Sequence, residues 1–228
     1  MRLMALAISV VGLCSLSWAA EKDKTSERLD DAADLFNEIM GAPDKSIPQD
    51  LLNKSSCIVL VPGLKKGGFV VAAKYGRGFV ICRGSSGQGW GPPAAVRIEG
   101  GSVGLQIGVS STDLVLLVMN ERGMKKLLTS KFTLGADASI AGGPVGRTAS
   151  AQTDALITAE ILSWSRSRGA FAGVSLDGAT LREDIDENEH LYGKRWENKQ
   201  ILNSGVAPPA GAAKLIGALN KYSARKTS

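Results

Sequence analysis

Apolar residues recur every three to four positions between Glu27 and Met40, which is the spacing of one face of an α-helix. The opposite face is mainly acidic, whereas helices that lie on membrane surfaces usually carry lysine and arginine on their polar face. The pattern therefore predicts an amphipathic helix that packs on its own domain. Gly41-Ala42-Pro43 ends this helix, and Pro48 begins a short second helix that runs through Leu52. The apolar stripe consists of Leu29, Ala32, Ala33, Phe36 and Met40.

The hydrophobic pattern changes at Cys57, after which short β-prone runs alternate with glycine-rich segments. Turns are expected at Pro62-Gly63, at Gly67-Gly68, at Gly76 and from Gly84 to Gly91. Six short strands at roughly regular spacing favour an antiparallel sheet over βαβ units. The predicted strands are Cys57–Val61, Phe69–Ala73, Gly78–Cys82, Trp90–Ile98, Val103–Val109 and Leu114–Met119.

The second half of the chain mixes both patterns. Asn120 caps a predicted helix, Glu121–Thr129, and strand-like segments follow at Phe132–Ile140 and Ala170–Leu176. The last helix is predicted from Ala210 to Tyr222. We therefore predict an α+β fold, with a strongly curved antiparallel sheet of short, glycine-rich strands flanked by N- and C-terminal helices. It forms one domain, residues 27–222, followed by a flexible tail, residues 223–228.

The amino-acid composition reduces the number of functional classes to which the protein could belong. Hydrophobic residues make up 44% of the 228 positions and charged residues 21%, which is enough apolar material for a core. His190 is the one histidine, so the usual base for a serine or cysteine nucleophile is scarce, and we expect no enzyme. The net charge is +5, but the basic residues form no concentrated run. This distribution argues against nucleic acid as a partner.

The first residues have the pattern of an export signal. Arg2 precedes an uncharged apolar stretch from Leu3 to Leu16, which is too short to span a membrane. Small residues follow, and we expect cleavage between Ala19 and Ala20. The protein is therefore predicted to be periplasmic or secreted, the alternative being an uncleaved N-terminal anchor. Leu13 stands where a lipoprotein signal has a small residue, so lipidation of Cys14 is not expected.

Two cysteines remain after such cleavage, Cys57 and Cys82. An even number of cysteines in an oxidising compartment is compatible with a disulfide. Both residues lie in apolar runs, where a buried free thiol is equally at home. The sequence leaves both alternatives open.

Other constellations predict no catalytic, cofactor or metal site. The glycine cluster before Arg147 lacks the lysine and hydroxyl of a phosphate loop, and His190 has only nearby glutamates as co-ligands. We therefore expect no cofactor and no metal. The acidic run of Asp184, Asp186, Glu187 and Glu189 is interpreted as a solvated loop.

Basic residues at predicted turns are the strongest candidates for binding. Cations at the turns of a sheet can converge at one end and hold phosphate groups through charge-assisted hydrogen bonds. A further basic pair, Lys125-Lys126, stands on the predicted short helix. The alternative for all these residues is a scatter of solubilising charge. The candidate lipid-binding residues are Lys65, Lys66, Arg147, Arg166 and Arg168.

Several ordered motifs together resemble the SYLF domain, also known as the actin-binding domain of the yeast Las seventeen-binding proteins. The segment Ser163-Trp-Ser-Arg-Ser-Arg-Gly-Ala-Phe-Ala-Gly-Val-Ser-Leu-Asp-Gly178 is similar to the signature of that family. The resemblance extends over almost the whole chain, from Glu27 to Tyr222. The further matches are Val61-Pro-Gly-Leu-Lys-Lys-Gly-Gly-Phe69, Tyr75-Gly-Arg-Gly78, Gly89-Trp-Gly-Pro-Pro93, Gly104-Leu-Gln-Ile-Gly108, Leu134-Gly-Ala-Asp137, Ala141-Gly-Gly-Pro-Val-Gly-Arg147, Asn188 to Gly193, Ile201-Leu202 and Pro208.

The resemblance implies a non-enzymatic lipid-binding module. Eukaryotic members are cytosolic, bind phosphoinositides and associate with actin. Two features depart from that pattern: the export signal implies a bacterial envelope protein, where actin is an unlikely partner, and the N-terminal helix is acidic. We therefore expect a periplasmic module that binds anionic lipid headgroups. The alternative is a structural envelope protein that acts through a protein partner without binding lipid.

Overall fold

The computed structural model describes residues 24–42, 46–68, 71–84, 87–103, 108–145, 158–167, 170–171, 176 and 178–223. The predicted export signal with Cys14, Ala19 and Ala20 lies outside these residues, as do Arg147 and Arg168. Within the described ranges, no helix is both long enough and apolar enough to cross a membrane.

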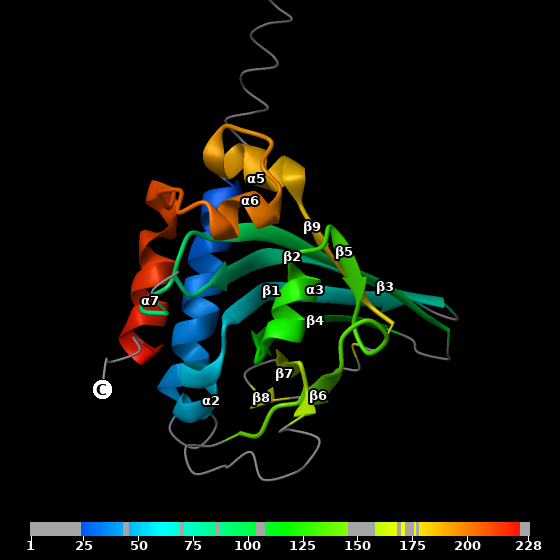
Figure 1. Ribbon diagram of the computed structural model, residues 1–228. Coiled ribbons are helices and arrows are strands. Elements are labelled where there is room, and N and C mark those ends of the chain that lie inside the picture. The colour runs from blue at the N-terminus through cyan, green and yellow to red at the C-terminus, as the bar shows by residue number, and fades with distance from the viewer. Residues whose placement is uncertain are drawn as a thin grey trace, which may run out of the picture.

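A single curved sheet forms the centre of the domain (Figure 1). Its strands run in the order β5-β9-β3-β2-β1-β4-β7-β6, and β8 pairs with β7. All the strand pairs are antiparallel except β6 with β7, which is parallel. The strands are β1 (Cys57–Gly68), β2 (Val71–Cys82), β3 (Ala94–Val103), β4 (Gly108–Val118), β5 (Lys131–Thr133), β6 (Ile140–Gly142), β7 (Ile161–Ser167), β8 (Ala170–Phe171) and β9 (Thr180–Glu183).

Helices flank this sheet, which confirms the predicted α+β fold. Figure 1 shows the N-terminal helix, residues 24–41, beside α7 at the same side of the sheet. The last helix extends through Ser223, one residue beyond the predicted end of the domain. The other helical segments are α2 (Gln49–Lys54), α3 (Glu121–Leu127), α5 (Ile185–Tyr192), α6 (Asn198–Asn203), η1 (Ala210–Ala212) and α7 (Ala213–Ser223).

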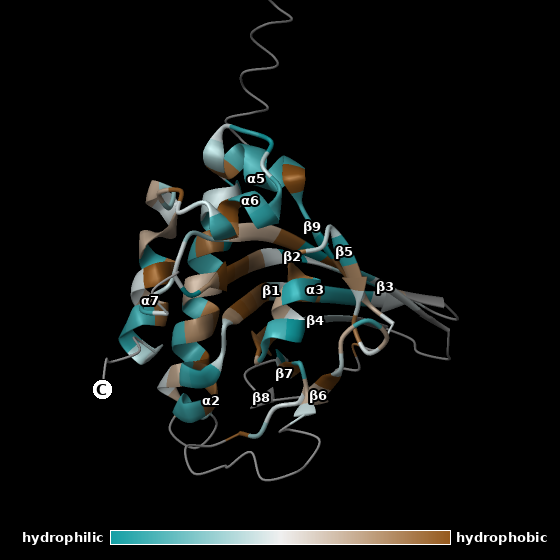
Figure 2. Cartoon of the chain, viewed as in Figure 1, coloured by the Kyte–Doolittle hydropathy of each residue, from teal (hydrophilic) through white to brown (hydrophobic). Residues whose placement is uncertain are grey.

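Alternate residues of the central strands enter two separate apolar cores. Ile58 and Leu60 face the N-terminal helix, α2 and α7, whereas Val59 and Val61 face the opposite core with α3 and α6. The predicted stripe of the N-terminal helix is buried in the first core, and the ring of Phe36 meets that of Tyr222 edge to face. Figure 2 shows the apolar parts of β1 and β2 beneath these helices. Packing of the N-terminal helix on its own domain is confirmed.

The predicted turn at Pro62-Gly63 is wrong, because this dipeptide forms a bulge inside one continuous strand. β1 contains one residue more than β2 between the Leu60–Phe79 and Lys65–Tyr75 pairs. Gly63 takes up the extra residue with φ +62°, and its N–H donates to Asp113 Oδ1 at 3.0 Å. Proline and glycine suit a bulge as well as a turn, since both interrupt regular pairing.

Gly76 is likewise part of a strand, and the strand has glycine there because the bulge passes very close to it. A Cβ added to Gly76 would lie 2.8 Å from side-chain atoms of Val61 and Leu64. At Gly78 the added atom would overlap the carbonyl oxygen of Leu60 and lie 2.8 Å from the Cα of Val61. The Tyr75-Gly-Arg-Gly78 motif therefore allows two backbones to pack without intervening side chains.

Helix α5 is attached to the start of β3 by buried polar groups. The Asn188 side chain accepts from the Ala95 N–H at 2.7 Å and donates to Asn198 Oδ1 at 2.8 Å. The Tyr192 hydroxyl donates to the Pro93 carbonyl at 2.6 Å. Burial raises the pKa of Tyr192 well above its ordinary value, because the phenolate would lose its hydration.

This burial predicts a loss of stability at alkaline pH. Above about pH 10 an unfolded tyrosine releases its proton while the folded Tyr192 retains it, so the free energy of unfolding falls as pH rises. Tyr192→Phe should remove this part of the pH dependence and cost about 1 kcal/mol at neutral pH through the lost hydrogen bond. Urea denaturation at several pH values measures both effects. Tyr75→Phe, which alters an exposed tyrosine, is the control, and an unchanged alkaline slope in Tyr192→Phe would contradict the assignment.

Candidate functional site

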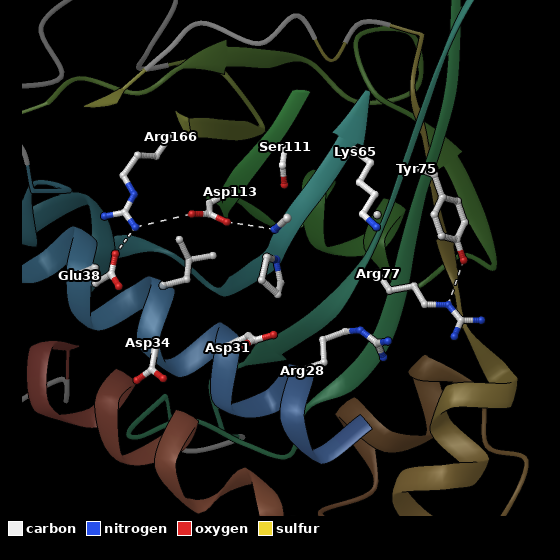
Figure 3. Close-up of a pocket in the computed structure, with 14 residues that line it drawn as sticks. Arg28, Asp31, Asp34, Glu38, Lys65, Tyr75, Arg77, Ser111, Asp113 and Arg166 are labelled. Carbon is white, nitrogen blue, oxygen red and sulfur yellow. Dashed lines mark hydrogen bonds and ion pairs between the residues drawn. The ribbon is translucent and has the colours of Figure 1, made fainter. Parts of the chain in front are cut away.

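A groove of about 570 Å³ lies between the N-terminal helix and strands β1, β2, β4 and β7 (Figure 3). Its size is that of a small-molecule site. The lining carries four cationic and four carboxylate side chains, so neither sign of charge dominates. The cations are Arg28, Lys65, Arg77 and Arg166, and the carboxylates are Asp31, Asp34, Glu38 and Asp113.

Arg166 of β7 closes one end of the groove and is already engaged in ion pairs. Its guanidinium pairs with Glu38 of the N-terminal helix and lies 3.6 Å from Asp113 Oδ2. Only 14% of the Arg166 side chain is exposed. Its partner Asp113 also accepts a hydrogen bond from the Gly63 N–H at the bulge, so Arg166 connects the N-terminal helix, through Asp113, to the bulged strand. Arg166 therefore belongs to the groove but is not the exposed cation that the sequence suggested.

At the other end of the groove, two buried carboxylates outside its lining pair with the lining residues Arg28 and Arg77. Asp184 and Glu187 are only 1% and 2% exposed, so they are not solvated as predicted. The acidic run is also not a loop, because Asp184 caps α5 and Asp186, Glu187 and Glu189 lie in this helix. Arg77 lies 3.1 Å from Asp184 and 3.2 Å from Glu187, and Arg28 also pairs with Glu187. Burial alone lowers the pKa of Arg77, but Asp184, Tyr75 and Glu187 raise it above its ordinary value overall. This end of the groove is a charge network that joins the N-terminal helix, β2 and α5.

The bulge decides which face of β1 carries Lys65. Cys57, Val59 and Val61 face the core opposite the N-terminal helix, and strict alternation would place Lys65 on that same face. The extra residue reverses the alternation, so Lys65 lines the groove. Lys65 lies directly opposite Tyr75 of β2 on one side and Ser111 of β4 on the other. These three neighbouring side chains form a row that faces the N-terminal helix.

The structure brings together only part of the predicted cation set. Lys65 and Arg166 line the groove, whereas Lys66, the next residue in the strand, does not and belongs to the opposite face. Lys65 and Lys66 lie in β1 and not in a turn, which corrects the prediction. Arg147 and Arg168 fall outside the described residues. Lys125 and Lys126 lie on α3, as predicted.

Sequence reasoning missed Arg28, Arg77 and Tyr75 as groove residues. Arg77 and Tyr75 belong to the Tyr75-Gly-Arg-Gly78 motif, and the match to this motif indicated that the segment does more than form a turn. Arg28 gave a weaker signal, since it is nearly the only cation on the acidic face of its helix. The partners Asp184 and Glu187 lie more than a hundred residues away in sequence, and no local pattern indicates that contact.

Two further motifs pack on each other and support the sheet. A Cβ added to Gly143 would overlap the indole ring of Trp164, and the indole N–H donates to the Pro144 carbonyl at 2.9 Å. The glycine segment before Arg147 therefore provides room for the tryptophan of the signature segment. Gly143 thus has a packing role in this contact.

Cys57 and Cys82 are joined by a disulfide in the structure. They are the first residue of β1 and the last residue of β2, and they face each other directly in the register. The Met124 sulfur lies 3.2 Å from Cys57 Sγ on the covered side of the sheet. The bridge therefore closes the base of the β1–β2 hairpin.

Comparison with known protein families shows which family the chain belongs to. The family model Ysc84, described as Las17-binding protein actin regulator, matches residues 99–222, more than half of the chain. The chain belongs to this SYLF family. The packed motifs around Trp164, Asn188 and Tyr192 all lie within the matched region.

Curated SYLF relatives match most of the chain. LAS seventeen-binding protein 3 of Saccharomyces cerevisiae is 32% identical over 188 residues, which are 80% of this chain and 40% of the relative. SH3 domain-containing YSC84-like protein 1 of Homo sapiens is 32% identical over 190 residues, 82% of this chain and 55% of the relative. The chain thus spans about half the length, or less, of these relatives. The name of the yeast relative describes a binding protein, and neither name mentions an enzymatic activity.

Proposed function

We propose that the domain is a non-enzymatic module that binds the phosphate of anionic lipid headgroups at a membrane surface. The observation that carries the proposal is Lys65, which is exposed in the groove and forms no ion pair with a described residue. A cation fixed on a rigid strand beside two hydroxyl groups suits a phosphate oxygen. The net charge of +5 favours approach to an anionic surface.

We further propose that the protein works in the cell envelope, in the periplasm or after secretion. The apolar N-terminal segment and the small residues before Ala20 support export. A disulfide at Cys57 and Cys82 suits an oxidising compartment. Intact-mass spectrometry of the protein from the envelope fraction tests this proposal, with Ala20 as the expected first residue. Recovery of the chain from the cytosolic fraction with Met1 retained would contradict export, whereas an envelope chain that retains Met1 would indicate the uncleaved anchor.

Vesicle binding tests the lipid proposal. The domain should sediment with phosphatidylcholine vesicles that contain phosphatidylglycerol and much less with phosphatidylcholine alone. Lys65→Gln should weaken binding about fivefold at low salt, since one cation near an anionic surface contributes about 1 kcal/mol. Binding should fade as salt rises because the attraction is screened.

Lys66→Gln is the matched control, because it removes the same charge from the adjacent residue on the opposite face of β1. It should weaken binding less than twofold or so, through long-range attraction alone. Arg166→Gln is unsuitable as a binding test, since removing it leaves Asp113 and Glu38 unpaired and should destabilise the domain. Equal effects of Lys65→Gln and Lys66→Gln would contradict the groove as the contact site.

A protein partner is the alternative, and the family description as a Las17-binding actin regulator favours it. In the envelope the partner would be a protein other than actin, and the same groove would contact it. The vesicle experiment separates the two functions. A domain that ignores anionic vesicles even at low salt acts through a protein partner and not through lipid.

A further inference from the structure

Ion pairs with described residues account for all the charged side chains of the groove lining except one cation and one carboxylate. Arg28 and Arg77 pair with buried acids of α5 and its N-cap, and Arg166 pairs with Glu38 and Asp113. Asp34 pairs at 2.8 Å with Lys214 of α7. Of the eight charged groups in the lining, Lys65 and Asp31 remain without an ion pair to any described residue.

These two groups lie on opposite walls. Figure 3 shows Asp31 on the N-terminal helix and Lys65 on the strand across the groove. Asp31 contributes to the raised pKa of Lys214, behind the hydrogen bond from Lys214 to Asp34, but it makes no ion pair with that lysine. The complement of such a groove is one small molecule that carries both a negative and a positive group.

The wall around Lys65 is suited to a phosphate. Tyr75, Lys65 and Ser111 lie side by side on three adjacent strands, so two hydroxyl groups flank one ammonium. The Tyr75 hydroxyl accepts from Arg77 Nε at 3.0 Å, which leaves its own proton free to donate. Three neighbouring donors on one wall match the three terminal oxygens of a phosphate monoester better than the two of a carboxylate.

The opposite wall is suited to an ammonium. Asp31 offers an exposed carboxylate, and the neighbouring Lys214 directs its hydrogen bond to Asp34 instead. A primary ammonium donates up to three hydrogen bonds, whereas a trimethylammonium donates none. We propose that the groove binds a phosphate ester that also carries a primary ammonium, as in phosphoethanolamine. The phosphate binds at the Lys65 row and the ammonium at Asp31.

This inference rests on the proposed function in sharing Lys65 as the phosphate ligand, and it adds recognition of a second group. Both possible sources carry the primary ammonium on a phosphate. A free phosphate monoester offers three terminal oxygens to the Lys65 row, whereas the phosphodiester of a lipid headgroup offers two and would leave one donor of the row without a phosphate oxygen. The groove volume of about 570 Å³ accommodates either. The experiment therefore has a soluble arm and a vesicle arm.

In the soluble arm, calorimetric titration compares four ligands with the folded domain: phosphoethanolamine, glycerol phosphate, ethanolamine and phosphocholine. Phosphoethanolamine should bind about tenfold or more tightly than each of the others, the difference expected from one charge-assisted hydrogen-bonded contact. Equal affinity for glycerol phosphate and phosphoethanolamine would overturn the proposal. Tighter or equal binding of phosphocholine would overturn the role of the primary ammonium.

Three variants assign the two contacts. Asp31→Asn should abolish the preference for phosphoethanolamine while leaving glycerol phosphate bound as well as before, or better, because a negative charge has been removed. Lys65→Gln should weaken both ligands about tenfold, and Lys66→Gln should weaken neither. The side chains of Asp31 and Lys65 are exposed, so unchanged urea midpoints are expected and verify that the variants fold. An Asp31→Asn protein that keeps the preference would refute the assignment.

The vesicle arm identifies the source of the ligand and keeps the two proposals apart. Replacing part of the phosphatidylcholine by phosphatidylethanolamine leaves the vesicle charge unchanged, so increased binding that Asp31→Asn removes supports a lipid headgroup. Soluble binding without such an increase supports a free phosphate ester as the ligand. Attraction to phosphatidylglycerol without any preference for phosphoethanolamine would uphold the proposed function and overturn this inference. The reverse result would uphold the inference and overturn the membrane function.

Discussion

Gly78→Ala should lower the free energy of unfolding by more than about 3 kcal/mol, which is beyond the usual range for a single methyl group. The added Cβ would overlap the Leu60 carbonyl oxygen and lie 2.8 Å from the Cα of Val61. Both are backbone atoms of β1, so no rotamer change relieves the overlap. The strands would have to separate at the bulge, which carries Lys65 and Gly63. Urea denaturation followed by tryptophan fluorescence measures the change.

Gly217→Ala is the matched control for this substitution. Gly217 lies exposed in helix α7, and a Cβ added there meets no atom within 4 Å. Alanine should therefore stabilise the protein, by about 0.5–1 kcal/mol, because glycine is a poor helix former. The same chemical change thus has opposite signs at the two sites. A Gly78→Ala protein that unfolds within about 1 kcal/mol of the wild type would show that the strands do not cross as closely as described.

The elements that the sequence predicts well are those whose signal is local. The N-terminal stripe, the helix capped by Asn120 and the final helix each depend on residues within a few turns of one another. Their apolar faces are buried as the spacing indicates. The runs Cys57–Val61 and Gly78–Cys82 lie in strands, although β1 and β2 are twelve residues long and continue through the turns predicted at Pro62-Gly63, Gly67-Gly68 and Gly76. The predicted strand Val103–Val109 divides between the end of β3 and the start of β4, and residues 104–107 lie outside the described ranges.

The sequence-based predictions are wrong where the same residue types suit two different structures. Pro62-Gly63 has the chemistry of a turn, but its partners Gly76 and Gly78 on β2 let it form a bulge instead. That choice depends on cross-strand contacts, which a single sequence does not reveal. It also decides the face of Lys65, so an error of one residue in register changes the predicted site.

The candidate site was only partly predictable for the same reason. A basic residue in the sequence does not show whether it is solvated or paired. Lys65 and Arg166 looked alike, yet Arg166 holds Glu38 and Asp113 whereas Lys65 has no charged partner in the described part of the chain. Likewise, Glu187 is buried against Arg28 and Arg77 while Glu189 of the same helix pairs with the exposed Arg195. Long-range pairing separates the structural charges from those that can bind a ligand.

Loss of the disulfide is the second large effect that we expect. Cys57 and Cys82 are 25 residues apart in sequence, and a cross-link over that distance restricts the unfolded chain by about 3.5 kcal/mol in the loop-entropy account. The Cys57→Ala/Cys82→Ala double variant should therefore unfold with roughly that much less free energy. Its Tm should fall by about 10 °C for a domain of this size. Calorimetry of the oxidised wild type and the double variant measures the difference.

Reduction provides an independent control, because it breaks the same cross-link without changing side-chain volume. The reduced wild type should resemble the double variant, and the reductant should leave the variant unchanged. The bridge closes the hairpin at the end opposite Lys65, which lies eight residues along β1, so the groove should keep its ligand preference whenever the domain is folded. Two titratable thiols in the oxidised, denatured protein would refute the bridge. A bridge that is present but contributes no stability would mean that the unfolded hairpin already holds its two ends together.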